Sequence, residues 1–343
     1  MNQKKSNNCL IDYLRCSIPN SNFSIVSNDV LGISILEFAS SNLKGSQYPT
    51  YDSSISFANI TLHSSQTHNN ILIDMSGQAC RQYEEYMCRS EGWHWYKLIA
   101  FILEIDGVFS RLDLALDIFD DSSPSVKVIQ DYIKRGQLST KSHKFVEINS
   151  GRISDGKLTG FTIYIGASPQ ILRIYDKKQE RIDNTGEIFN VEKWVRWELE
   201  LTGKKAMLVA YKISSGKPLN AIIKGILSAH YSFKTRPKNK SDLHNKNRLP
   251  NMRWWEKFVD GIEEIPLKVQ REKMTLKKKK NWIEKNTAKS ISMVYEAFRS
   301  VYGEEYAEIY LKELIESGRE KITKLDETLI EQRILELVSE DEY

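Results

Sequence analysis

Apolar and polar residues alternate with the period of a β-strand through much of the first two thirds of the chain. The clearest stretch is 109–119, where Leu112, Leu114 and Leu116 fall on one side and charged residues on the other. Residues i, i+2 and i+4 of a strand share a face, so this pattern predicts a strand with one face on a core. Similar or shorter runs predict strands at 23–26, 33–38, 55–62, 71–75, 145–148, 160–166, 171–176 and 192–201.

Helical periodicity dominates the remainder of the chain. It predicts helices at 78–105, broken near Gly92, and at 125–134, 217–233, 289–302 and 325–338. The polar stretch 234–249 between them predicts a linker or loop. We therefore expect an α+β fold, with an antiparallel-rich sheet in a domain spanning 1–233. A basic linker and a helical C-terminal region would occupy 234–343.

Three predicted strands place their charged side chains on one face of the sheet. The charged positions are Arg111, Asp113 and Asp117 on the first strand; Arg173, Tyr175 and Lys177 on the second; and Arg196, Glu198 and Glu200 on the third. Like charges on neighbouring strands repel, so acidic pairs of this kind are uncommon on an ordinary solvent-facing sheet. The face is therefore a candidate site.

Several acidic oxygens on one face suit a divalent cation such as Mg²⁺ or Mn²⁺. The basic side chains beside them could hold phosphate oxygens. A tyrosine hydroxyl on the same face could attack a phosphodiester. The alternative is a charge-paired sheet surface on which Tyr175 only packs, and the pattern gives the two interpretations about equal weight.

Net charge is unevenly distributed. The whole chain carries +4, but residues 201–300 hold 23 Lys/Arg against 8 Asp/Glu, and residues 301–343 hold 5 against 13. This asymmetry predicts a polyanion-binding region followed by an acidic helical tail, with a solvated charged surface as the alternative.

Composition narrows the class of protein. Hydrophobic residues make up 41% and charged residues 27%, which is typical of a globular protein and excludes global disorder. No apolar run is long enough for a transmembrane helix, and the N-terminal residues lack the apolar stretch of a signal peptide. The four cysteines have no zinc-type spacing and are too few for a disulfide scaffold. We expect a protein of the reducing cytoplasm that does not contact a membrane.

Six segments resemble, in order, the Rep_trans family of rolling-circle replication initiators from Gram-positive plasmids and the related relaxases of integrative conjugative elements. They are 73–81 (IDMSGQACR), 110–117 (SRLDLALD), 162–168 (TIYIGAS), 172–180 (LRIYDKKQE), 196–201 (RWELEL) and 280–283 (KNWI). The resemblance implies a dimeric initiator with a divalent metal and a nicking tyrosine on a strand. Such a protein binds a plasmid double-strand origin, cuts one strand, stays attached through a 5′-phosphotyrosine and rejoins the strand. A host PcrA-type helicase is the implied partner, since the chain has no intact ATPase motif.

Carried onto this chain, the resemblance makes Tyr175 the best candidate nucleophile, with Tyr164 as the competing choice. Tyr175 is preferred because basic residues flank it, whereas Thr162 and Gly166 share the face of Tyr164. The strongest candidate metal ligands are Asp113 and Glu198, followed by Asp117 and Glu200. The residues that would clamp phosphate or lower the tyrosine pKa are Arg173, Lys177 and Arg196. The segment 167–169 (ASP) departs from the family, whose members more often carry a basic residue near the serine.

DNA-binding candidates lie in the basic part of the chain. Lysines of the run Lys277, Lys278, Lys279 and Lys280 would contact phosphates without reading sequence. Residues such as Arg248 and Arg253 could reach base edges, although a solvated charged loop explains the same pattern. Three alternatives to a replication initiator stay open: a conjugative relaxase with the same chemistry, a metal nuclease in which water attacks, and a non-catalytic DNA-binding protein.

Overall fold

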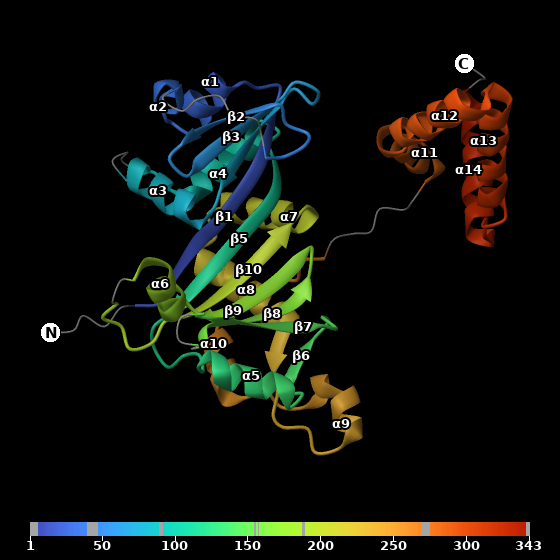
Figure 1. Ribbon diagram of the computed structural model, residues 1–343. Helices are drawn as coiled ribbons and strands as arrows, with labels where there is room; N and C mark the ends of the chain where they lie inside the picture. Colours follow the sequence, from blue (N-terminus) through green and yellow to red (C-terminus); the bar gives the residue numbers. More distant parts are fainter. Residues whose placement is uncertain are drawn as a thin grey trace. The chain divides into compact units, whose positions relative to one another are not determined.

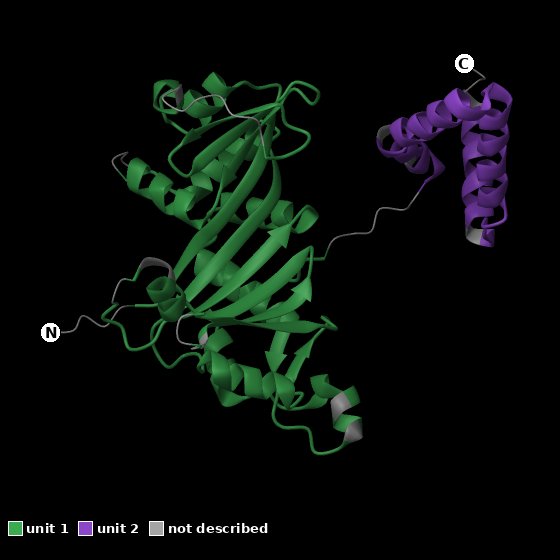
Figure 2. Ribbon diagram, viewed as in Figure 1, with its two compact units in different colours: residues 1–269 green, residues 270–343 purple. Residues whose placement is uncertain are grey.

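The computed structural model describes residues 6–39, 47–88, 92–153, 156, 158–186, 189–268 and 275–340. The chain divides into two compact units, Met1–Val269 (unit 1) and Gln270–Tyr343 (unit 2), coloured separately in Figure 2. Unit 1 contains the sheet, and the regular secondary structure in the described residues of unit 2 is all helical.

A nine-stranded sheet forms the centre of unit 1, and every neighbouring pair of strands in it is antiparallel (Figure 1). In spatial order its strands are β2 (Ser53–Phe57), β3 (Ile60–Ser65), β4 (Asn70–Met75), β1 (Asn8–Pro19), β5 (Val108–Ile118), β10 (Val195–Thr202), β9 (Gln170–Asp176), β8 (Leu158–Ala167) and β7 (Phe145–Gly151). The sheet and the C-terminal helices confirm the predicted α+β class.

The helices of unit 1 pack largely on the apolar side of this sheet. Leu112, Leu114 and Leu116 of β5 lie in one core with α4, α7 and α8. The helical elements are α1 (Phe23–Ile25), η1 (Val26–Val30), α2 (Ile35–Ala39), α3 (Gly77–Met87), α4 (Trp95–Glu104), α5 (Val126–Lys134), α6 (Lys177–Thr185), α7 (Lys204–Ser214), α8 (Leu219–His230), α9 (Lys240–His244), η2 (Lys246–Arg248) and α10 (Arg253–Val259). Because the leucine face packs against these helices, the charged side chains of β5, β9 and β10 lie on the opposite face of the sheet.

Strand β1 contains an irregularity that the alternation pattern does not reveal. Its pairing with β5 shifts register between Ile11 and Tyr13, so the residue between them, Asp12, is extra. Ile11 and Leu14 are both completely buried although they are three positions apart. A β-bulge of this kind turns the side chains that follow it, and here it brings Asp12 and Tyr13 toward the charged side.

Two of the predicted strands are wrong, because residues 23–26 and 33–38 lie mainly in the short helical elements α1, η1 and α2. The Asn22 side chain accepts a hydrogen bond from the Ile25 backbone N–H at 3.0 Å, which caps the first turn. Val26 and Val30 are then buried on one side of the helical segment at a spacing of four. A short run rich in β-branched residues does not by itself distinguish a strand from a short helical segment.

The sheet-containing unit extends well beyond residue 233, the boundary expected from the sequence. Strand β11 (Tyr231–Phe233) pairs with β6 (Leu138–Thr140), and the backbone of Lys234 bridges to Asn251. Trp255 and Phe258 of α10 are buried against Trp197 of the main sheet. The polar stretch 234–249 therefore connects two parts of the same core, and residues 234–269 belong to unit 1.

Unit 2 contains α11 (Leu276–Asn286), α12 (Ala288–Tyr302), α13 (Glu304–Arg319) and α14 (Lys324–Glu340). Helices α12 and α14 match the predicted segments 289–302 and 325–338 closely. Phe298 of α12 packs edge-on against Tyr310 of α13, with ring centroids 4.8 Å apart. Among the helices in the described ranges, none is sufficiently long and apolar to cross a membrane.

Candidate active site on the charged sheet face

Strand pairing aligns the predicted site residues in rows across the charged face. Tyr175 of β9 lies opposite Arg196 of β10, which in turn lies opposite Asp117 of β5. One step along, Arg173 lies opposite Glu198, and a further step places Glu200 opposite Asp113. The three strands predicted to share one charged face are therefore direct neighbours in the sheet, in the order β5, β10, β9.

The Tyr175 hydroxyl donates a hydrogen bond to Glu198 Oε2 at 2.8 Å. The other oxygen of that carboxylate, Oε1, accepts a hydrogen bond from Arg173 Nη1 at 2.7 Å. Glu198 is only 4% exposed, so this contact is shielded from water. The carboxylate is thus fixed between the phenol and the guanidinium, at hydrogen-bond distance from the proton that Tyr175 must lose to act as a nucleophile.

Burial raises the pKa of both Tyr175 and Glu198. For Tyr175, the neighbouring negative charge of Glu198 raises the pKa further. For Glu198, the negative charges of Asp12 and Asp113 add to the effect of burial, while Arg173 opposes it. The phenol is therefore neutral in this state, and the carboxylate beside it is a stronger base than an exposed glutamate.

Arg111 and Arg173 tie the remaining acidic groups together. Arg111 donates to both carboxylate oxygens of Asp113, at 2.9 and 2.5 Å, and its Nη2 lies 3.1 Å from Glu200 Oε2. Arg173 also donates from Nη2 to Glu200. Two guanidinium groups and three carboxylates thus form one connected network, which holds Glu198 in position.

Arg196 is held by two aspartates in the most buried part of the face. It donates from Nε and Nη2 to the two oxygens of Asp117, at 2.7 and 2.8 Å, and from Nη1 to Asp12 at 3.0 Å. Arg196 is 5% exposed and Asp117 is 3% exposed. The bidentate pair fixes the guanidinium behind Tyr175, its cross-strand neighbour.

Lys177 and the competing tyrosine also lie at this site. The Lys177 ammonium is 5.6 Å from the centre of the Tyr175 ring and 2.7 Å from Glu180 Oε2. Tyr164 lies opposite Arg173 on β8, with the guanidinium carbon 5.7 Å from its ring centre. The Tyr175 hydroxyl is hydrogen-bonded to a buried carboxylate, whereas the Tyr164 ring packs against a cation.

The four predicted metal ligands do not converge into one cage. In the described parts of the chain, no group of three or more His, Cys, Asp or Glu side chains could hold a metal ion. Asp117 is bound bidentately by Arg196, and Glu200 contacts two arginines. Asp113 is likewise bound bidentately by Arg111, and Glu198 accepts hydrogen bonds from Arg173 and Tyr175. Mg²⁺ is commonly bound by one or two carboxylates plus substrate phosphates, so an ion on this face would share Asp113 and Glu198 with the arginines that already bind them.

A second cluster on the same side of the sheet was missed in the sequence. Asp74 of β4 accepts hydrogen bonds from the hydroxyls of Tyr13 and Tyr48, each at 2.5 Å, and Arg15 Nε lies 3.4 Å from it. The Arg111 guanidinium carbon lies 4.1 Å from the centre of the Tyr13 ring and so connects this cluster to the charged face. Asp74 lies in the IDMSGQACR segment, but its partners follow a bulge that strict alternation does not predict.

The predicted DNA-binding residues are divided between the two units. Arg248 ends η2 and Arg253 begins α10, both in unit 1, whereas the run from Lys277 to Lys280 lies on α11 of unit 2. Arg253 lines an open groove of about 670 Å³, together with Arg236, Asn251, Trp254 and Tyr132. On α11, Lys279 contacts Asp326 at 2.7 Å and Lys280 contacts Glu284 at 3.5 Å. The unit 1 groove therefore combines guanidinium groups with aromatic rings, the usual elements of a single-strand binding surface.

Comparison with known proteins defines the class to which this sheet and its charged face belong. Residues 107–315 match the Rep_trans family, described as replication initiation factor, and the chain belongs to that family. Residues 8–101 match a second family, the rolling circle replication initiation protein N-terminal domain. The two matches together include β1 to β10 and confirm the resemblance seen in the sequence segments.

Individual relatives agree with this assignment. The chain is 27% identical over 295 residues to a Bacillus subtilis (strain 168) protein named “Putative DNA relaxase NicK”, covering 84% of this chain and 81% of that one. A solved rolling circle replication initiator protein from Geobacillus stearothermophilus superimposes with a TM-score of 0.62 at 24% identity. That match covers 77% of this chain and 100% of the other, and it shows a shared fold.

Proposed function

We propose that the protein is a site-specific DNA nicking and joining enzyme that initiates rolling-circle replication through covalent attachment to Tyr175. The observation that carries the proposal is the 2.8 Å hydrogen bond from the Tyr175 hydroxyl to Glu198, beside Arg173. A buried carboxylate with a raised pKa, fixed on a phenol, is the arrangement that activates a tyrosine as nucleophile.

In the proposed step, the Tyr175 oxygen attacks a backbone phosphorus of one DNA strand while the phenolic proton moves to Glu198. The phosphorus–O3′ bond breaks, leaving a 5′-phosphotyrosine ester and a 3′ end whose oxygen takes a proton from water. Attack by a 3′ hydroxyl on the ester reverses the step and releases Tyr175. The ester conserves the energy of the broken bond, so rejoining requires no nucleotide cofactor.

Basic side chains around Tyr175 would bind the non-bridging phosphate oxygens. Arg173 and Arg196 are held by buried carboxylates, so their donors are oriented before the substrate arrives. Lys177, at the start of α6, lies beside the ring of Tyr175. Donors that are already oriented lower the free energy of the transition state because no reorganisation is needed during attack.

We propose Asp113 and Glu198 as the protein ligands of a divalent cation, Mg²⁺ or Mn²⁺. When bound, the ion would supply positive charge to the phosphate oxygens. Mn²⁺ binding can be measured by its electron paramagnetic resonance signal, and Asp113→Asn is expected to weaken it at least tenfold. Unchanged Mn²⁺ affinity in that variant would remove Asp113 from the ligand set.

Origin DNA is the proposed substrate, with the Trp254 groove and the α11 lysines as additional contacts. The family resemblance extends the proposal to a homodimer that acts in the cytoplasm with a host PcrA-type helicase. A second candidate is a conjugative relaxase that performs the same chemistry at a transfer origin, because a relative of comparable length is named as a relaxase. Cleavage selection on a library containing both kinds of origin would separate the two.

The test is formation of a denaturant-stable protein–DNA adduct. The full chain is incubated with Mg²⁺ or Mn²⁺ and single-stranded oligonucleotides from a selected origin, then analysed on a denaturing gel. Wild type and Tyr164→Phe are expected to form the adduct, and Tyr175→Phe is expected to form none. Adduct formation by Tyr175→Phe would contradict the nucleophile assignment, and nicking without an adduct would indicate attack by water.

A further inference from the structure

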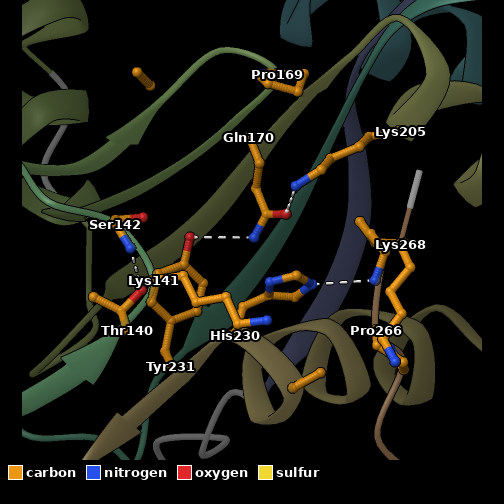
Figure 3. Close-up of a pocket in the computed structure, with 13 residues that line it drawn as sticks. Thr140, Lys141, Ser142, Pro169, Gln170, Lys205, His230, Tyr231, Pro266 and Lys268 are labelled. Atoms are coloured by element: carbon orange, nitrogen blue, oxygen red, sulfur yellow. Dashed lines mark hydrogen bonds between the residues drawn. The ribbon is translucent and has the colours of Figure 1, made fainter. Parts of the chain in front are cut away.

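Three lysines surround an open pocket of about 560 Å³ at the end of unit 1 where β8 turns into β9 (Figure 3). Lys141 follows β6, Lys205 lies at the start of α7, and Lys268 follows Pro266. We call this the lysine pocket, and its other polar lining residues include Gln170, His230 and Tyr231. Gln170 faces the helical side of β9, because it alternates with Arg173 and Tyr175 along the strand.

No acidic side chain balances the positive charge of this pocket. Its lining contains neither Asp nor Glu, and within the described residues none of the three lysines forms an ion pair. Bringing like charges together from three separate segments costs free energy, which an anion bound among them would recover. An ordinary solvated surface intersperses both signs of charge instead.

Lys141 and Lys268 are exposed at the rim of the pocket, whereas Lys205 is held from beneath by buried groups. Lys205 Nζ donates to Gln170 Oε1 at 2.7 Å, and Gln170 Nε2 donates to the Tyr231 hydroxyl at 3.3 Å. Gln170 and Tyr231 are 8% and 2% exposed. The one ammonium that is half-buried is therefore positioned by two nearly inaccessible partners (Figure 3).

His230 positions the third lysine and does not itself contribute charge. Its Nε2 accepts a hydrogen bond from the Leu267 backbone N–H at 3.1 Å, which holds the chain segment that carries Lys268. Burial lowers the pKa of His230 to about 4, with the charges of Lys205 and Lys141 acting in the same direction. The imidazole thus stays neutral at physiological pH and keeps its acceptor, while the lysines supply the field.

We infer that the lysine pocket binds a backbone phosphate of DNA that flanks the nicked position. This inference rests on the proposed function, because it assigns a further contact to the same substrate. Lysine recognises phosphate as a point charge without reading sequence. Tyr231 is too buried to offer a stacking surface to a base, which favours a backbone phosphate over a free nucleotide.

Gln170 and Tyr175 point to opposite faces of β9, so DNA that contacts both the lysine pocket and the charged face has to pass around the end of the strand where β8 turns into β9. Gln170 and Tyr175 are five residues apart on this strand, or about 17 Å at roughly 3.3 Å per residue. The same distance spans about five base pairs of a duplex that rises about 3.4 Å per step. DNA held in the lysine pocket therefore contributes affinity for a long substrate and none for a short oligonucleotide that carries only the nick site.

The experiment compares Lys205→Gln/Lys268→Gln with the control Lys97→Gln/Lys127→Gln, in which both lysines are exposed and lie outside the pocket. Binding of the full chain to a duplex is measured against salt concentration. Loss of two phosphate contacts is expected to reduce the slope of log K against log salt by about 1.8 in the pocket variant and not in the control. Adduct formation with a short oligonucleotide is expected to equal wild type in both variants. Lys205→Arg alone keeps both positive charges and is expected to keep the wild-type slope.

Several results would overturn the inference. One is a slope of log K against log salt in the pocket variant that equals the slope in the control. Another is loss of the adduct with the short oligonucleotide in a variant whose melting temperature is unchanged.

Titration with ATP and with inorganic phosphate tests for a different ligand. If the pocket variant lost binding of these ligands and kept the duplex slope, a free phosphate compound would be the true ligand. Wild type that binds duplex DNA but forms no adduct would refute the proposed function and leave the pocket standing, whereas wild type that binds no DNA would refute both.

Discussion

Replacing Asp117 by asparagine is expected to destabilise unit 1 by about 3 kcal/mol. Asp117 accepts hydrogen bonds from Arg196 at 2.7 and 2.8 Å, and the two side chains are 3% and 5% exposed. Asparagine has nearly the same volume but no charge, so the substitution leaves the packing intact. It also turns one N–H₂ donor group toward the guanidinium.

The magnitude follows from the burial of the pair. Two unit charges about 4 Å apart interact by about 4 kcal/mol at an effective dielectric constant of about 20. Removing one partner of a buried pair typically costs about 3–5 kcal/mol, because the other charge stays buried without compensation. Arg196 keeps Asp12 at 3.0 Å, which places the expected cost at the lower end of that range. The corresponding decrease in melting temperature is about 6–12 °C.

Calorimetry and urea unfolding of the full chain would measure this difference. The matched control is Asp131→Asn, which removes an exposed pair with Arg135 at 3.8 Å on α5 of the same unit and should cost less than about 1 kcal/mol. Adding Arg196→Gln to Asp117→Asn should cost less than the sum of the single changes, because both charges of the buried pair are then removed together and only the less buried Asp12 loses its partner. Equal stability of Asp117→Asn and the control would refute the idea that this pair holds the face together.

Four further predictions concern unit 1. Glu198→Gln should slow adduct formation about 10²–10⁴-fold and abolish the acidic limb of the pH–rate profile. In wild type the midpoint of that limb should lie above the ordinary glutamate pKa, because the pKa of Glu198 is raised. Because the pKa of Glu198 is higher in the folded state than in the unfolded state, the folded state binds more protons between these two pKa values. The free energy of unfolding of wild type should therefore fall as pH rises through that interval. Urea titrations at several pH values should show this dependence in wild type and not in Glu198→Gln. Gly225→Ala should destabilise by about 1–3 kcal/mol in calorimetry, because an added Cβ would lie 2.6 Å from the Glu263 carbonyl oxygen. Ellman's reagent should modify exposed Cys88 rapidly under native conditions and Cys16 and Cys80 only on unfolding, because burial raises the pKa of both buried thiols.

The sheet core and the charged face could be predicted because each depends on one strand at a time. Alternation along β5, β9 and β10 identifies which residues share a face, and antiparallel pairing then brings the three strands together. The pattern within one strand does not predict the order of the strands in the sheet. It also does not predict which side chains pair across strands, such as Arg196 with Asp117. Those pairs depend on cross-strand register, which long-range packing sets.

The N-terminal part of the site could not be predicted, for an identifiable physical reason. Strand β1 carries Asp12, Tyr13 and Arg15 to the charged side, but the bulge after Ile11 breaks its period of two. The predicted domain boundary at residue 233 was too early because composition describes only the local chain. The polar stretch 234–249 has the composition of a linker, but the residue that packs the following segment on the sheet, the buried Trp255, lies further along the chain.

Charge balance connects the separate features of the face. Three arginines, Arg111, Arg173 and Arg196, lie among five carboxylates: Asp12, Asp113, Asp117, Glu198 and Glu200. If all were ionised, the face would carry a surplus of two negative charges in a poorly hydrated region. Burial raises the pKa of both Asp113 and Glu198, and for Glu198 the negative charge of Asp12 adds to it. A DNA phosphate adds another negative charge, so its entry requires that a proton or a cation accompany it. Transfer of the phenolic proton from Tyr175 to Glu198 leaves the net charge of the face unchanged, so the compensating charge has to come from a proton taken up from solvent or from a bound cation. The hydrogen bond between the two side chains sets where the phenolic proton goes, and the charge that arrives with the phosphate sets whether its transfer is favourable.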